Sequence, residues 1–216
     1  MPGEPKPHDA GMESVTDILR RHKEIERDYA NYWKFRIDRK LEEQHIAACL
    51  LAYLEAFEGW TGAKVASSDR DPPDCCGTTG DGKTFGIEVT ELVRQKTVKR
   101  HQLRRNAEGR GLTPPAKAAN RWDMAIWTAE ALGSKLAAII QAKDKPAIGG
   151  PFAPYLVAIV TDEGSVTPAL VAEALTGFEI ECRYIDSAYL LLSYDPRVED
   201  FPNRIPVYKI PVSKVS

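Results

Sequence analysis

The sequence predicts an α/β protein with a mixed central sheet flanked by helices. Two continuous apolar runs, at 155–161 and 188–193, are typical of strands that are buried on both faces. Apolar residues at helical spacing predict helices at 38–57, 120–143 and 168–175. Strands and helices that alternate along a chain in this way indicate an α/β sheet.

The chain is long enough for one domain with a substantial core. Its 216 residues are 43% apolar and 28% charged, which is ordinary for a soluble protein. We expect residues 12–216 to form a single domain, in which 12–37 are a helical extension, and residues 1–11 to be a disordered tail. The net charge of −2 excludes a chain that is basic throughout, so any nucleic-acid binding must come from a local patch.

The cellular compartment follows from the cysteines and from the hydropathy. The four cysteines include no C-x-x-C pair, and no signal peptide precedes them, so a reducing cytoplasm fits better than a disulfide framework. We interpret the vicinal Cys75 and Cys76 as strand residues. No apolar run approaches the length of a membrane span, so no membrane insertion is expected.

The N-terminal extension carries two patterns with two interpretations each. A capping box at 14–17 predicts a helix, and the charge run at 20–27 is either its solvated face or an arm that contacts DNA or a second subunit. Aromatic residues at 32, 33 and 35 lie among basic residues. They either anchor a helix to the core or stack on bases.

Residues 38–57 are predicted to form a helix whose buried stripe runs from Ile46 to Phe57, with Glu43 at the N-terminal end of that stripe. A short strand is expected at 63–67. Two prolines at 72 and 73 then impose an extended backbone just before Asp74.

The segment 72–92 is the most informative part of the chain. Asp81 and Gly82 predict a two-residue hairpin turn. In the strand at 84–90, alternation places three apolar side chains against a core and Glu88 on the opposite face. If the hairpin forms, Asp74 lies close to Glu88 across the two strands. Two neighbouring carboxylates repel unless their charge is offset, and a divalent cation such as Mg²⁺ does this. The alternative is a solvated hairpin with no bound ion.

Pro73-Asp74, a hairpin and then Ile87-Glu88-Val89-Thr90 resemble the motif of the PD-(D/E)XK nuclease superfamily, which has the restriction-endonuclease-like fold. The motif is Pro-Asp, a spacer and Asp/Glu-x-Lys, and its context is similar here: a helix before, a hairpin around it and a helix after. Thr90 stands where the motif has Lys.

The resemblance implies a Mg²⁺ site, with Mn²⁺ as a substitute ion. Asp74 and Glu88 would bind the ion together with the carbonyl of Val89, and Glu43, with Glu42 as the second candidate, would complete the site or order its waters. The alternative is that either glutamate is an ordinary first-turn residue favoured by the helix dipole. A lysine from a neighbouring element would replace the motif lysine. Lys96 is the candidate, with Gln95 as a neutral alternative, and Lys83 is disfavoured because it lies in the turn.

A basic stretch at 94–110 follows directly. It is well placed to hold a phosphate backbone, or else it is a solvated helix or mobile loop. The cations expected to contact nucleic acid are Arg94, Lys99, Arg100, Arg104 and Arg105. Glycine and proline at 109–115 favour a flexible flap.

Later residues are expected to serve the fold. We interpret Trp122 and Trp127 as packing residues of the helix at 120–143, and Lys135 and Lys143 as surface charges. A weaker strand is predicted at 206–212.

Three functions are consistent with the sequence. The favoured one, implied by the resemblance, is a metal-dependent nuclease that hydrolyses DNA, and a homodimer would suit double-strand cutting. The second is a catalytically inactive nucleic-acid-binding or regulatory module on the same fold. The third is an interaction protein whose basic stretch contacts an acidic partner.

Overall fold

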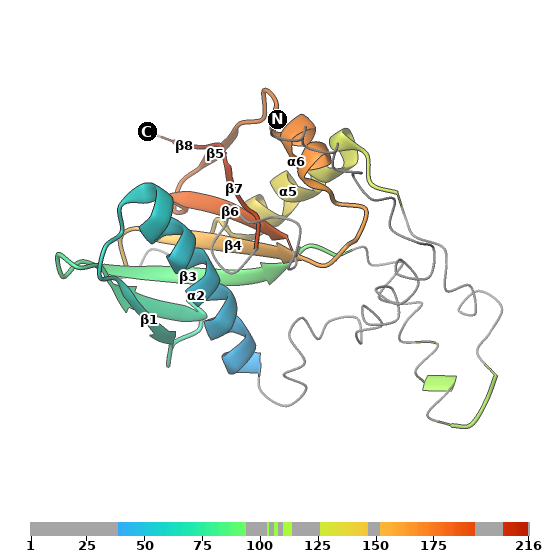
Figure 1. The fold of residues 1–216 in the computed structure, drawn as a ribbon, viewed down its shortest axis with the longest axis horizontal. Helices are drawn as coiled ribbons and strands as arrows, with labels where there is room; N and C mark the ends of the chain where they lie inside the picture. Colours follow the sequence, from blue (N-terminus) through green and yellow to red (C-terminus); the bar gives the residue numbers. More distant parts are fainter. Residues whose placement is uncertain are drawn as a thin grey trace, which may run out of the picture.

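The computed structural model describes residues 39–93, 103, 106–107, 110–113, 126–146, 152–192 and 205–215. The predicted tail and helical extension at 1–37 lie outside these ranges. In the described part, three helices surround a six-stranded sheet with the strand order β1-β2-β3-β4-β6-β7 (Figure 1). The predicted α/β class with a mixed sheet flanked by helices is therefore confirmed.

The sheet joins an antiparallel half to a parallel centre. β1 (Lys64–Ser67), β2 (Cys75–Thr78) and β3 (Thr84–Glu91) form an antiparallel meander. β4 (Tyr155–Thr161) and β6 (Ser187–Leu192) continue it in parallel with β3. β7 (Val207–Ile210) closes the far edge in antiparallel pairing, and β5 (Ile180–Cys182) pairs separately with β8 (Val212–Lys214).

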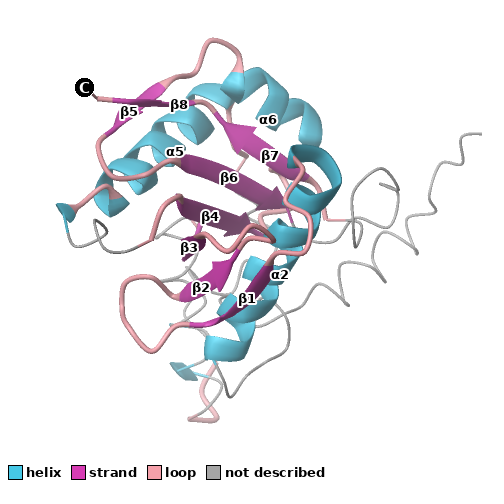
Figure 2. Ribbon diagram, turned by 90° about the vertical axis from the view of Figure 1, so that its left-hand side faces the viewer, coloured by secondary structure: helices cyan, strands magenta, loops and turns pink. Residues whose placement is uncertain are grey.

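Helices cover both faces of the sheet, which makes three layers (Figure 2). α2 (Arg39–Glu58) packs on one face, where Leu50 and Leu54 meet Phe85 and Ile87 of β3. α5 (Ala129–Lys143) and α6 (Pro168–Leu175) pack on the other face. The central strands are therefore buried on both sides, as their continuous apolar runs predict. None of the helices in the described ranges combines the length and apolar character needed to cross a membrane.

Most predicted elements are confirmed within a residue or two, but the helix predicted at 120–143 begins later. Residues 126–128 are not helical, and α5 starts at Ala129. Its N-cap is Thr128, whose hydroxyl accepts a hydrogen bond from the N–H of Ala131 at 3.2 Å. Trp127 is buried just ahead of the helix, so its packing role is confirmed but its place in a helical stripe is wrong. Residues 120–125 lie outside the described ranges.

The β2–β3 hairpin pairs as predicted, but its turn is longer than two residues. Thr79 donates its N–H to the carbonyl of Lys83 at 2.9 Å, and Gly82 donates to the carbonyl of Thr79 at 2.9 Å. The loop is therefore the three residues 80–82. Gly82 has φ of 85°, the left-handed conformation that ends such a loop.

The C-terminal strand predicted at 206–212 is two strands. Pro211 separates β7 from β8, since proline has no N–H to donate to a ladder. β5, the partner of β8, was not predicted, because three residues are too few to show a pattern.

Candidate functional site

Asp74 lies directly before β2, at the point where β3 continues past the end of its ladder with β2 while still paired with β4 on its other side. The β2–β3 ladder ends at the pair Cys75 and Ile87, whereas β3 continues to Glu91. Extending this register by one residue places Asp74 opposite Glu88, as predicted. The next N–H on this edge, that of Val89, is bonded by Asp74 Oδ2 at 2.8 Å. The carboxylate therefore takes the place of a missing strand and is held in one orientation.

Glu88 points to the face of the sheet that α5 covers. Its register neighbour on β4, Val157, belongs to the core cluster that includes the buried residues of α5. Only 6% of Glu88 is exposed. Lys143, in the last turn of α5, places Nζ 2.5 Å from Oε1, and the hydroxyl of Tyr155 lies 3.2 Å from Oε2. Both oxygens of this buried carboxylate thus have a donor, which burial of a charge requires.

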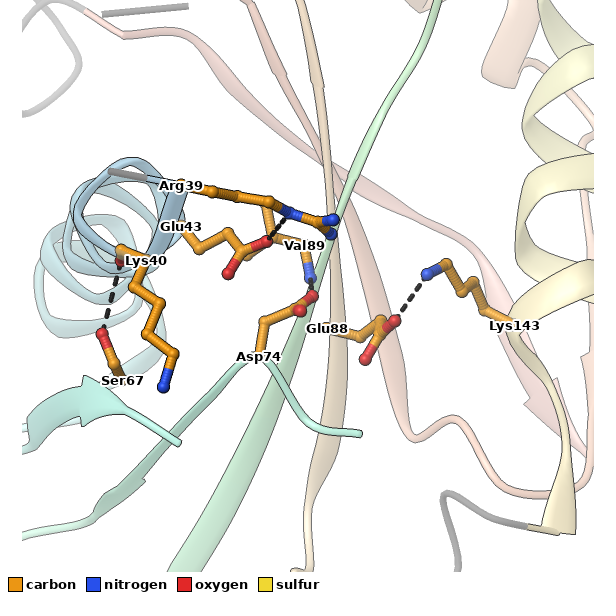
Figure 3. A network of polar contacts seen from close by, with 8 residues as sticks. All are labelled: Arg39, Lys40, Glu43, Ser67, Asp74, Glu88, Val89 and Lys143. Carbon is orange, nitrogen blue, oxygen red and sulfur yellow. Dashed lines mark hydrogen bonds and ion pairs between the residues drawn. The ribbon is translucent and has the colours of Figure 1, made fainter. Parts of the chain in front are cut away.

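The side chain of Glu43 extends from α2 toward Asp74 and Glu88. Its side chain is 12% exposed, and its Oε1 accepts a bond from Nε of Arg39 at 2.6 Å. Figure 3 shows the carboxyl groups of Glu43, Asp74 and Glu88 in a row that starts at α2 and ends at Lys143 of α5. Glu43 of α2 and Lys143 of α5 therefore lie on either side of Asp74 and Glu88 (Figure 3).

The charges in this row act on one another. The pKa of Asp74 is raised from 3.8 to about 6, mainly by burial, and the nearby Glu88 and Glu43 raise it further. The N–H of Val89 and the ammonium of Lys143 lower it in part. Burial, and then the charge of Glu88, also raise the pKa of Tyr155, so its hydroxyl stays a donor. The site is a set of carboxylates whose repulsion one lysine offsets only in part.

The donor atoms fit a magnesium ion bound by two carboxylates. Mg²⁺ takes one or two carboxylates and fills its other positions with water and phosphate oxygens. Asp74 and Glu88 would supply the two carboxylates, and the carbonyl of Val89 faces the same strand edge as its N–H, because both groups of a strand residue point to one side. In the described ranges, no group of three or more acidic, histidine or cysteine side chains is arranged to hold a metal. Glu43 is paired with Arg39 at 2.6 Å.

The other predicted site residues have different outcomes. Lys96 and the cations of the basic stretch, Arg94, Lys99, Arg100, Arg104 and Arg105, lie outside the described residues. Lys83 is in the exposed turn and pairs with Asp81 at 2.7 Å, as its low rank as a candidate implies. Thr90 is partly buried on the same face as Glu88 and carries no charge.

Three residues of the site, Arg39, Lys143 and Tyr155, were not predicted. Lys143 was interpreted as a surface charge, and this is wrong: its side chain is 33% exposed and its ammonium contacts Glu88. The sequence did contain a signal, because Lys143 lies on the same face of the helix as Leu136 and Ile140. Both of these apolar residues are fully buried in the structure. Tyr155 gave no signal beyond its place at the start of an apolar run.

Comparisons with protein-family models, with curated proteins and with solved structures returned no match.

Proposed function

We propose that this chain is a metal-dependent nuclease with a restriction-endonuclease-like fold, which hydrolyses phosphodiester bonds of DNA through a Mg²⁺ ion held by carboxylates. We further propose that Lys143 performs the role of the lysine that the PD-(D/E)XK motif would place at position 90. One observation carries this proposal: Asp74, which directly precedes β2, accepts the N–H of Val89 at 2.8 Å, and the adjacent Glu88 has a lysine ammonium 2.5 Å from its Oε1.

The surroundings of the motif support the proposal. α2 precedes the hairpin, Asp74 lies directly before β2, Glu88 lies in β3, and α5 follows and packs on the face to which Glu88 points. This is the context of a helix before, a hairpin around and a helix after the motif. The mixed sheet flanked by helices is also the architecture that the resemblance implies.

Each side chain has a distinct part in the proposed reaction. Asp74, Glu88 and the Val89 carbonyl would hold the ion, which when bound lowers the pKa of a water molecule and neutralises charge on the phosphate. The N–H of Val89 orients Asp74, and Tyr155 orients Glu88. Lys143 brings a positive charge where negative charge develops on the phosphate oxygens.

Glu43 and Arg39 lie at the α2 end of the row of carboxylates (Figure 3). Arg39 is 82% exposed, so its guanidinium is accessible to a phosphate group while its Nε holds Glu43. Glu43 would order waters beside the ion.

DNA binding is proposed for the basic stretch, including Arg100 and Arg104. β3 ends at Glu91, three residues after Glu88, so the chain leaves the sheet beside the site just before this stretch begins. Replacing both arginines by Ala should weaken binding at low salt and reduce its salt dependence, because fewer counterions are released. An unchanged slope of affinity against salt would show that they do not contact phosphates.

The activity is tested with supercoiled plasmid, linear duplex, single-stranded DNA and RNA, each with Mg²⁺, Mn²⁺ or EDTA. We expect metal-dependent cleavage of DNA that Glu88→Ala abolishes while binding is retained. Lys143→Ala should lower the cleavage rate by about 10²-fold or more, as loss of a transition-state charge contact does. Lys145→Ala, an exposed lysine two residues further on, is the matched control and should cut normally. Equal cutting by the Glu88 variant would refute the site.

A non-catalytic nucleic-acid-binding module is the second candidate, and one observation favours it. Lys143 already pairs with Glu88, and an ammonium in that position can replace a metal ion in neutralising the carboxylates. This candidate predicts DNA binding that is equal in Mg²⁺ and EDTA and no cleavage of any substrate.

A further inference from the structure

The loop at 183–186, between β5 and β6, contacts the ends of the two elements that supply the hydrogen-bond donors of Glu88. The first contact is with Asp144, the residue after Lys143 and the C-cap of α5. Asp144 Oδ2 accepts a bond from the N–H of Arg183 at 2.8 Å. Its Oδ1 accepts bonds from the N–H groups of Tyr184 at 2.7 Å and Ile185 at 3.1 Å.

These bonds fix the end of α5 in space. Asp144 also donates its own N–H to the carbonyl of Ile140 at 2.9 Å, so it belongs to the helix and to the loop at once. Bonds from N–H groups to an ionised carboxylate are stronger than neutral ones. Lysine has a long side chain with much rotamer freedom. Anchoring the backbone next to Lys143 therefore restricts the positions that its ammonium can take.

The second contact is with Tyr155, the first residue of β4. Asp186 Oδ2 accepts a bond from the N–H of Tyr155 at 2.6 Å, and the N–H of Asp186 donates to the Tyr155 carbonyl at 2.8 Å. Asp186 Oδ1 pairs with Lys214 of β8 at 2.9 Å. The backbone of Tyr155 is thus bonded on both its polar groups, which sets the point from which its ring extends to Glu88.

We propose that Asp144 and Asp186 are positioning residues, which act through Lys143 and Tyr155 to set the orientation of the Glu88 carboxylate for the reaction. This inference rests on the proposed nuclease function. Both donors of Glu88 depend on one short loop, so the loop holds the two oxygens of the carboxylate in a fixed relation to α5 and β4. An ordinary helix cap would stabilise α5 without affecting turnover.

The kinetics of Asp144 variants distinguish a residue that positions Lys143 from one that only caps α5. Asp144→Ala should lower kcat for DNA cleavage about tenfold with KM unchanged, because geometry at the reacting group is lost while DNA binding is not. Asp144→Asn keeps one oxygen acceptor and should recover part of the rate. The matched control is Thr167→Ala, which removes the N-cap bond of α6 to Leu170 and should leave kcat unchanged.

A double-mutant cycle tests whether the effect passes through Lys143. In a Lys143→Ala background, Asp144→Ala should cause no further loss of kcat, since coupled residues are not additive. The inference would be overturned if the fold losses of kcat in the two single variants multiplied in the double variant, or if kcat were unchanged in Asp144→Ala alone.

A measurement on the metal-free protein keeps the inference separate from the nuclease proposal. In ¹H–¹⁵N spectra, an ammonium group held in an ion pair gives a resonance that is protected from exchange, and Lys143→Arg identifies it by its loss. Asp144→Ala should broaden or abolish this resonance, and Thr167→Ala should not. If the resonance is unchanged by Asp144→Ala, Asp144 does not position Lys143, whether or not the protein cleaves DNA.

Discussion

Asp74 should make the folded protein less stable at neutral pH while being required for its function. The pKa of its carboxyl is raised from 3.8 to about 6, mainly by burial and then by the charges of Glu88 and Glu43. Replacing it by Asn removes the charge and keeps an oxygen that can accept the N–H of Val89. We therefore expect Asp74→Asn to abolish cleavage and to stabilise the protein.

The sign and size of this change in stability follow from the coupling between proton binding at Asp74 and folding. A raised pKa means that the folded state binds the proton more tightly than the unfolded state. The stabilising contribution of the Asp74 carboxyl is therefore fully present below about pH 4 and is lost as the pH rises through about 6. A difference of about two units corresponds to at most about 3 kcal/mol. Because the side chain is only partly buried, solvent screening reduces this, and we expect Asp74→Asn to gain about 1 kcal/mol at pH 8.

Urea unfolding monitored by tryptophan fluorescence measures this gain, since Trp127 is buried in the folded protein. The unfolding free energy of wild type and variant should be compared near pH 4 and near pH 8, with Asp69→Asn, an exposed neighbour, as the control. Adding Mg²⁺ at pH 8 should stabilise wild type by binding only the folded state, and should stabilise the variant much less.

Two results would refute this reasoning. If Asp74→Asn were less stable than wild type at pH 8, the carboxylate would be a net stabilising group and not one of a repelling set. If its gain were equal at pH 4 and pH 8, the gain would not come from the charge. Equal stabilisation of both proteins by Mg²⁺ would place the ion elsewhere.

Three further predictions concern stability. Burial raises the pKa of Glu91 to about 7, so the unfolding free energy should fall as the pH rises from about 5 to about 7. Glu91→Gln should reduce this dependence of the unfolding free energy on pH in urea titrations, and an unchanged dependence would contradict the prediction. Gly77→Ala would drive a methyl group into the β1 backbone and the Phe85 ring and should cost more than about 2 kcal/mol, whereas Gly164→Ala, in open space, should cost under about 0.5 kcal/mol. Thr128→Ala should lower the unfolding free energy by about 1 kcal/mol through loss of the α5 cap, and an unshifted urea midpoint would show that the cap bond contributes nothing.

The sequence predicted the parts of the fold that depend on local chemistry. The helix at 38–57 is α2 within one residue, and the elements at 155–161 and 168–175 are β4 and α6 with the same bounds. Periodicity and apolar runs determine such elements locally. The opposition of Asp74 and Glu88 was predictable for the same reason, because it needs only the register of one hairpin.

The parts that failed depend on contacts between distant segments or on competing local signals. Lys143 is a charged residue on an apolar helix face, and its role appears only when α5 is packed over β3, 55 residues away in sequence from Glu88. The start of α5 was predicted too early, since the apolar spacing also extends N-terminal to Thr128, whose capping bond marks the first turn of the helix. A turn of three residues resembled one of two because both favour glycine at the last position.

The distance in sequence between Glu88 and Lys143 has a consequence for how this chain can change in evolution. Their contact is set by the stacking of a helix on a sheet, so the number of residues that connect the two layers does not enter the geometry. Insertions or deletions in that connection would leave the ion pair in place. Distant relatives could then share the same chemistry while no linear pattern of fixed spacing detects it.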